Sequence, residues 1–123
     1  MYKFEKLEVY QLALSYLDVM YMLAGRLPRT EDRNLQPQLI RSATSIVLNI
    51  AEGSTSQSDP EQKRFLGMAL RSLMETVACQ RIIQRRGYST EQEISKAYDH
   101  SQIIFAKLQA MRRSLRQSDT NGK

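Results

Sequence analysis

The sequence contains no tryptophan, a single cysteine (Cys79) and a single histidine (His100) among its 123 residues. One cysteine cannot form a disulfide within the chain, which excludes a disulfide-stabilised scaffold and favours a reducing compartment such as the cytoplasm. No apolar run approaches the ~18 residues that a membrane-spanning helix needs. Residues 1–6 also lack the apolar core of a signal peptide. We therefore expect a cytoplasmic protein without membrane contact.

The motifs of common enzyme sites are missing as well. The sequence has no nucleophile motif, no phosphate-binding glycine loop and no cysteine pair. A metal site inside a helical bundle needs several glutamates and a Glu-x-x-His pair, which does not occur here. We interpret His100 as a solvated or half-buried surface side chain and Cys79 as a small core or interface residue. The sequence therefore predicts a non-enzymatic protein that holds no metal and no cofactor.

Proline is also scarce, and all three prolines lie between or at the edges of segments in which apolar residues recur every three or four positions. Hydrophobic residues make up 41% of the chain and charged residues 25%, as in an ordinary globular domain. The pattern predicts an all-α protein, an antiparallel up-down-up-down four-helix bundle, formed by a single domain over residues 1–117. The expected helices span about 7–26, 35–52, 60–86 and 91–116, and a disordered polar tail follows at 118–123.

Capping residues place the ends of these helices. The second helix is expected to begin after Asn34 and the third after Asp59, which is followed by a proline at the first helical position. Thr90 opens a capping box for the fourth helix. Gly53 and Gly87 are expected to end the second and third helices in a left-handed conformation.

The first helix is apolar around most of its circumference, with a single narrow polar stripe. A surface helix of a monomer normally buries a narrower face, so we expect one side of this helix to meet another subunit. Tyr10, Tyr16 and Tyr21 suit such an interface, because tyrosine combines apolar contact with a polar tip. The alternative is ordinary packing within the domain core.

The second helix carries Asn49 and Glu52 close to its C-terminus, where the helix dipole disfavours a carboxylate. A structural clamp would compensate Glu52 through an arginine of the next helix, Arg64 or Arg71, or through an arginine of a neighbouring subunit. The alternative is a functional pair, in which the carboxylate moves a proton or grips a ligand. We favour the clamp, since antiparallel neighbours bring the two helices together.

Basic residues cluster near two helix ends in a chain whose net charge is +5. In antiparallel helices these ends lie at opposite poles of the bundle, and the cations at each pole are able to hold phosphates. The alternative is that these cations only complement the helix dipole. Few exposed aromatic residues are expected, so binding would be directed at the nucleic-acid backbone and tolerant of sequence. The candidate nucleic-acid-binding residues are Arg81, Arg85, Arg86, Lys107, Arg112, Arg113 and Arg116.

Several segments resemble a known family over roughly residues 4–115. The chain is similar to the four-helix-bundle proteins encoded in intervening sequences of 23S ribosomal RNA genes. The resemblance implies ring-like homopentamers and no particular reaction. At the level of the fold it extends to the accessory variability proteins that accompany reverse transcriptases in diversity-generating retroelements, whose basic pentamer binds nucleic acid and the polymerase. The segments that carry the family resemblance are 4–11, 38–46, 49–53, 64–66, 69–75 and 87–88.

Together these features predict a non-enzymatic oligomeric bundle that binds nucleic acid, RNA or DNA, or a nucleoprotein through its basic helix ends. The alternative is a protein-binding scaffold or accessory subunit, for a partner such as a polymerase, that makes no nucleic-acid contact.

Overall fold

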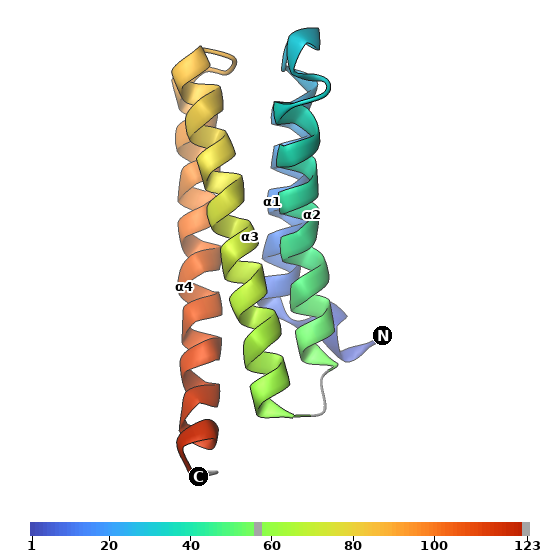
Figure 1. Ribbon diagram of the computed structural model, residues 1–123, viewed down its shortest axis with the longest axis vertical. Helices are drawn as coiled ribbons and strands as arrows, with labels where there is room; N and C mark the ends of the chain where they lie inside the picture. Colours follow the sequence, from blue (N-terminus) through green and yellow to red (C-terminus); the bar gives the residue numbers. More distant parts are fainter. Residues whose placement is uncertain (56–57, 122–123) are drawn as a thin grey trace.

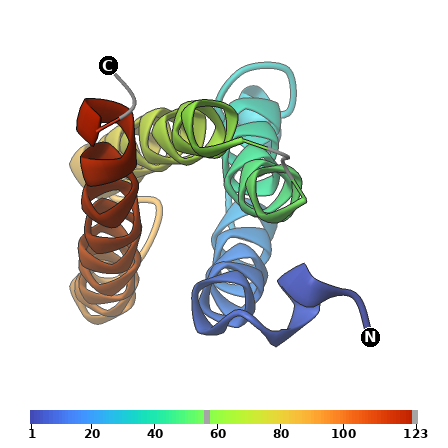
Figure 2. The ribbon, with the colours of Figure 1, turned by 90° about the horizontal axis from the view of Figure 1, so that it is seen from below.

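Four long antiparallel helices and two short 3-10 helices make up the fold in the computed structural model, which describes residues 1–55 and 58–121, with side chains up to residue 115 (Figure 1). Each helix packs against its neighbour in sequence, and α1 and α4 close the arrangement with a smaller contact (Figure 2). The predicted all-α, up-down four-helix bundle is therefore confirmed. The helices are η1 (Lys3–Lys6), α1 (Glu8–Gly25), η2 (Arg29–Glu31), α2 (Leu35–Ser54), α3 (Asp59–Arg86) and α4 (Glu91–Asn121).

One hydrophobic core runs along the axis of the bundle and takes side chains from all four long helices. α2 buries one apolar face, formed by Leu35, Leu39, Ala43, Ile46, Val47 and Ile50. Within the described residues no helix is both long and apolar enough to cross a bilayer. The largest fully buried side chains are Tyr16, Met20, Leu23, Leu39, Ile46, Ile50, Leu66, Leu73, Ile83, Ile94, Ile104 and Leu108.

The tyrosines of α1 do not share one environment. Tyr16 is fully buried and packs edge-on against the His100 ring, with 5.5 Å between ring centroids. It therefore belongs to the core and not to a subunit interface, which corrects the interpretation from sequence. Tyr10 is half-buried against Phe4, whereas Tyr21 is exposed. Of the three tyrosines, Tyr21 is the one most available to a partner.

Gly53 does not end α2, contrary to the prediction. The helix continues to Ser54, and its C-cap residue Thr55 has right-handed helical angles. Gly53 is instead buried beside α3, where an added Cβ would lie 3.1 Å from the Cβ of Phe65. The glycine is thus required for the close approach of α2 and α3 and not for a turn.

Two helix starts also differ in detail from the prediction. Ser58, not Asp59, is the N-cap of α3, because its hydroxyl accepts a hydrogen bond of 3.3 Å from the backbone N–H of Glu61. Asn34 does precede α2, but its side chain does not cap the helix and donates instead to the carboxylate of Glu31. Both differences are local, since neighbouring polar residues compete for the same role.

Strong local signals set the boundary between α3 and α4. Gly87 ends α3 with φ of 70°, and Thr90 and Glu93 form the predicted capping box at the start of α4. The helix then runs to Asn121, beyond the expected end at residue 116. Residues 122–123 of the expected tail lie outside the described part of the chain, and disorder of the tail stays a prediction.

The Gly87→Ala variant is expected to lose about 1 kcal/mol of unfolding free energy, because a Cβ is strained in the left-handed conformation. Gly25→Ala is the matched control: this glycine is the last residue of α1, and an added Cβ there meets nothing within 4 Å. Urea denaturation of both variants makes the comparison. A loss in Gly25→Ala as large as that in Gly87→Ala would contradict the conformational explanation.

Candidate nucleic-acid interface

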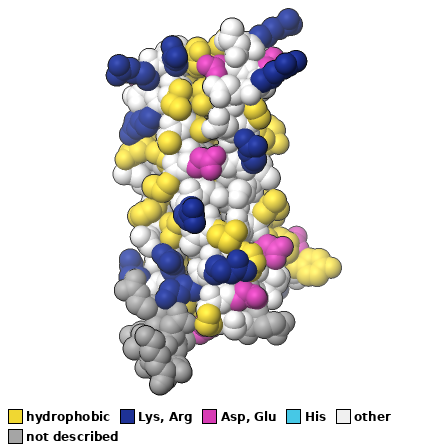
Figure 3. Space-filling view, viewed as in Figure 1, with side chains coloured by type: hydrophobic (Ala, Val, Ile, Leu, Met, Phe, Trp, Pro, Cys, Tyr) yellow, Lys and Arg dark blue, Asp and Glu magenta, His cyan; other side chains and the backbone are white. Residues whose placement is uncertain are grey.

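The basic residues near the ends of α3 and α4 lie at opposite poles of the bundle, because the two helices run antiparallel (Figure 1). A space-filling view shows lysine and arginine side chains towards both ends of one face, with more hydrophobic surface between them (Figure 3). We call the group at the end of α3 the upper cluster and the group in α4 the lower cluster. The upper cluster is Arg81, Arg85 and Arg86, and the lower cluster is Lys107, Arg112 and Arg113. The predicted Arg116 lies outside the residues whose side chains are described.

The upper cluster combines one oriented arginine with two exposed ones. The Arg81 guanidinium lies over the ring of Tyr98, 4.3 Å from its centroid, and donates a 2.8 Å hydrogen bond to the side chain of Gln84. Arg85 and Arg86 are exposed to solvent in the last turn of the helix. This position satisfies the helix dipole and at the same time leaves both guanidinium groups open to a phosphate.

Acidic residues also occur at the upper pole. Tyr88 donates a 2.9 Å hydrogen bond to the carboxylate of Glu31, and this bond, followed by weaker contributions that include nearby Arg86, lowers the pKa of Glu31. Arg26 forms an ion pair of 2.7 Å with Glu93 and so links the end of α1 to the start of α4. These contacts hold the pole together, but they also offset part of its positive charge.

The three residues of the lower cluster differ in their contacts: some bind or pack against another helix, and one is exposed. The Lys107 ammonium lies 2.6 Å from the carboxylate of Glu8 and ties α4 to α1, so it is partly neutralised. Arg113 is exposed. Arg112 points the other way, toward α3, where an added Cβ on Gly67 would lie 3.6 Å from its Nη2. The predicted cluster therefore contains one inter-helix ion pair, one open cation and one cation packed on a neighbouring helix.

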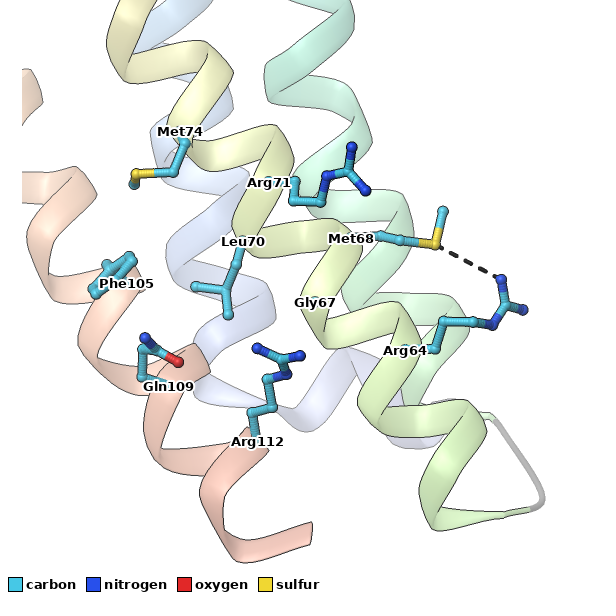
Figure 4. Close-up of a pocket in the computed structure, with 9 residues that line it drawn as sticks. All are labelled: Arg64, Gly67, Met68, Leu70, Arg71, Met74, Phe105, Gln109 and Arg112. Atoms are coloured by element: carbon cyan, nitrogen blue, oxygen red, sulfur yellow. Dashed lines mark hydrogen bonds between the residues drawn. The ribbon is translucent and has the colours of Figure 1, made fainter. Parts of the chain in front are cut away.

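A hollow of about 430 Å³ lies between α3 and α4 next to Arg112 (Figure 4). Two further arginines of α3, Arg64 and Arg71, line it from the side of Gly67 opposite α4. The sequence suggests these two as clamp partners of Glu52. The sequence shows that Arg64, Gly67 and Arg71 lie along one stripe of α3. It does not show which residue of α4 faces that stripe.

The proposed clamp can be compared with the contacts that join α2 and α3. The side-chain amide of Asn49 donates to the carbonyl and to the hydroxyl of Ser45, one turn earlier in α2, at 2.9 and 3.0 Å. The same Ser45 hydroxyl accepts a 2.9 Å hydrogen bond from Ser72 of α3. Arg64 lies 4.8 Å from the ring of its neighbour Phe65. A bond from Glu52 to either arginine stays a prediction.

Hydroxyl groups therefore form the described polar link between these helices. Besides the Ser45–Ser72 pair, the Thr76 hydroxyl lies 2.8 Å from that of Ser42 and 2.8 Å from the carbonyl of Ser72. The small side chains let the helices approach closely while their polar atoms remain paired. The side of α2 that carries Ser42 and Ser45 thus acts as a helix-packing surface, and Asn49 is bonded to Ser45 beside it.

The sole histidine and cysteine show no arrangement for catalysis. His100 is half-buried against Tyr16, and burial lowers the pKa of its imidazole, partly opposed by a backbone hydrogen bond involving Leu12. Cys79 is buried, and that burial raises the pKa of its thiol, which makes it less reactive at neutral pH. Within the described part of the chain no three acidic, histidine or cysteine side chains gather as a metal site would require.

These features place the chain among the small all-α bundle proteins. It belongs to the 23S rRNA-intervening sequence protein family, whose model matches residues 5–110. A crystal structure of a protein with unknown function from the S23 ribosomal protein family of Bacteroides thetaiotaomicron is similar, with a TM-score of 0.79 and 25% sequence identity. The match covers 85% of this chain and 97% of that one. No functionally curated protein matches the sequence.

Proposed function

We propose that this protein is a non-enzymatic, oligomeric bundle of the cytoplasm that binds nucleic acid or a nucleoprotein through phosphate contacts at its basic ends. The observation that carries the proposal is the exposure of Arg85, Arg86 and Arg113 at the two poles of a chain with a net charge of +5. Clustered cations attract nucleic acid through release of its counterions, which requires no base-specific contact. RNA and DNA are both suitable ligands for such contacts.

Self-association is part of the proposal. Large apolar side chains remain exposed on the surface of the chain, among them Tyr21 and Met22 on α1, Ile82 on α3 and Ile103 on α4. Burying them between subunits would remove apolar area from water. The family resemblance implies a ring of five chains, which would have a mass of about 71 kDa, five times 14.2 kDa. Light scattering of the purified protein measures this mass directly.

RNA titration at 50 and 200 mM salt tests the nucleic-acid role. If about six phosphates are contacted per binding site, the affinity should fall by about 10³-fold between these salt concentrations. The double variant Arg85→Ala/Arg86→Ala should weaken binding and flatten the salt dependence. Lys3→Ala/Lys6→Ala is the matched control, because it removes the same charge from exposed positions in η1, outside both clusters.

The alternative function is a protein-binding scaffold or accessory subunit, with a partner such as a polymerase. The exposed apolar side chains of α3 and α4 would also serve this role. Absence of RNA and DNA binding at 50 mM salt, or equal loss of binding in both double variants, would overturn the nucleic-acid proposal and favour the scaffold.

A further inference from the structure

A pocket between α3 and α4 lies closer to the upper pole than the hollow next to Arg112. Its volume is about 370 Å³, and none of the described residues that line it is charged. It shares Met74 of α3 and Phe105 of α4 with the hollow (Figure 4). Met74 is 46% exposed, so the pocket opens to solvent and suits an aromatic side chain with a polar tip. The residues that line it are Met74, Val77, Tyr98, Ser101, Gln102 and Phe105.

A cation stands at the edge of this pocket. The Arg81 guanidinium lies over the ring of Tyr98, one of the lining residues, and is exposed to solvent. That contact and the hydrogen bond to Gln84 orient the guanidinium before any partner arrives. An aromatic side chain with a carboxylate close to it would therefore match the pocket in both shape and charge.

The outer face of α1 carries such a pair of side chains. The charged residues of this helix are Glu8 and Asp18, and both are acidic. Asp18 is exposed, and Tyr21 and Met22 have exposed fractions of 55% and 43%. Tyr21 follows Asp18 by three positions, so the carboxylate and the ring project from neighbouring turns of the same face. α1 therefore presents to solvent the kind of group that the pocket accepts.

The two surfaces lie on opposite sides of the bundle and at the same height. α1 and α2 form one side, and α3 and α4 form the other (Figure 2). The ion pair of Arg26 with Glu93 marks a common level on α1 and α4. Tyr21 and Tyr98 each lie five residues from that level towards the lower pole, about 7.5 Å at a rise of about 1.5 Å per residue. A second copy placed alongside in the same orientation thus brings its Tyr21 level with the pocket.

We infer that Tyr21 of one copy inserts into the pocket between α3 and α4 of a second copy, with Asp18 beside the Arg81 guanidinium. The contact rests on the proposed function, of which self-association is part, and specifies the two surfaces that meet. Because these surfaces differ and lie on opposite sides of the chain, the contact is head-to-tail. Each added copy then leaves one surface of each kind open until the assembly closes on itself.

Two substitutions at exposed positions each block one of the surfaces. Tyr21→Arg removes the ring and brings a cation towards Arg81, and Met74→Arg places a cation in the pocket. In light scattering the natural chain should be an oligomer, whereas each variant alone should be a monomer of 14.2 kDa. Circular dichroism checks that both variants are folded.

An equimolar mixture of the two variants is the decisive sample. It should contain a dimer of about 28 kDa, twice 14.2 kDa, because each variant keeps the surface that the other has lost. Absence of the dimer would overturn the inference. Self-association of either variant alone would also overturn it, since it would mean that like surfaces meet.

The charge pair is tested by exchange of its two members. Asp18→Arg and Arg81→Glu should each weaken association about tenfold or more, because each places like charges together. The double variant Asp18→Arg/Arg81→Glu should regain affinity, and failure to do so would contradict the pairing. Leu48→Arg is the matched control, because it adds the same charge at an exposed position of α2 that does not line the pocket. Dissociation of this control would overturn the assignment of the surfaces.

The same measurements distinguish this inference from the proposed function. A natural chain that is monomeric in light scattering would overturn both the self-association and the contact. An oligomer whose mass is the same in Tyr21→Arg and Met74→Arg would overturn the contact alone and leave self-association standing.

Discussion

The Leu73→Ala variant is expected to unfold with a free energy lower by about 2–5 kcal/mol, the usual cost of removing a fully buried leucine side chain. Leu73 has no exposed surface and lies near the middle of α3, which packs against both α2 and α4. The substitution therefore loses buried apolar area and leaves a cavity that rigid helices fill poorly. Against a typical total of about 5–15 kcal/mol, the loss is large. The midpoint of urea denaturation, at unchanged slope, measures it.

Leu48→Ala is the matched control for this prediction, because the same side chain is shortened in the same way. Leu48 lies on α2 and is 58% exposed, so its replacement should change stability by no more than about 0.5 kcal/mol. Losses of unfolding free energy of similar size in the two variants would show that burial of a side chain within the single chain does not determine how much its removal costs.

The second large effect concerns a polar pair inside the core. Gln80 is 1% exposed, and its side-chain amide is hydrogen-bonded to the hydroxyl of the fully buried Tyr16 and lies 3.7 Å from the Sδ of Met20. The Oε1 of Gln80 is buried without a partner among the described residues. Burial, together with nearby Cys79, raises the pKa of Tyr16, so its hydroxyl stays protonated at every ordinary pH. The Gln80 amide N–H donates to the Tyr16 hydroxyl in a region that water does not reach, so this hydrogen bond pairs a buried donor with a buried acceptor.

Tyr16→Phe and Gln80→Leu should each lower the free energy of unfolding by about 1–3 kcal/mol, because each leaves the other polar group buried and unpaired. The double variant should lose less than the sum of the two, since both unpaired groups are then gone. Thermal and urea denaturation of the four proteins give the coupling energy. Strict additivity would mean that the hydrogen bond contributes nothing to stability.

Periodic patterns are sufficient to predict the architecture, because each helix buries one face and short connections force antiparallel neighbours. Helix ends are harder to assign. Gly53 and Gly87 look alike in the sequence, but one permits close packing against Phe65 and the other adopts a left-handed turn. The difference depends on the position of α3 beside α2, which local sequence does not contain.

The same limit applies to the candidate site. The separation of two basic poles follows from antiparallel packing and is predictable from the sequence. The ion pair of Lys107 with Glu8 and the placement of Arg112 on α3 depend on the rotation of α4 about its own axis. Contacts between residues far apart in the sequence decide that rotation. For this reason the sequence pairs Arg64 and Arg71 with α2, whereas the structure places them around a hollow shared with α4.

The length of α3 sets a distance that any extended ligand would have to match. From Arg64 beside the hollow to Arg86 at the upper pole, the helix rises roughly 33 Å, at about 1.5 Å per residue. One turn of B-form duplex spans a nearly equal distance, about 34–36 Å. A duplex lying along α3 would therefore present the same backbone to both basic groups one turn apart. Oligonucleotides much shorter than about ten base pairs could reach only one of them on each chain.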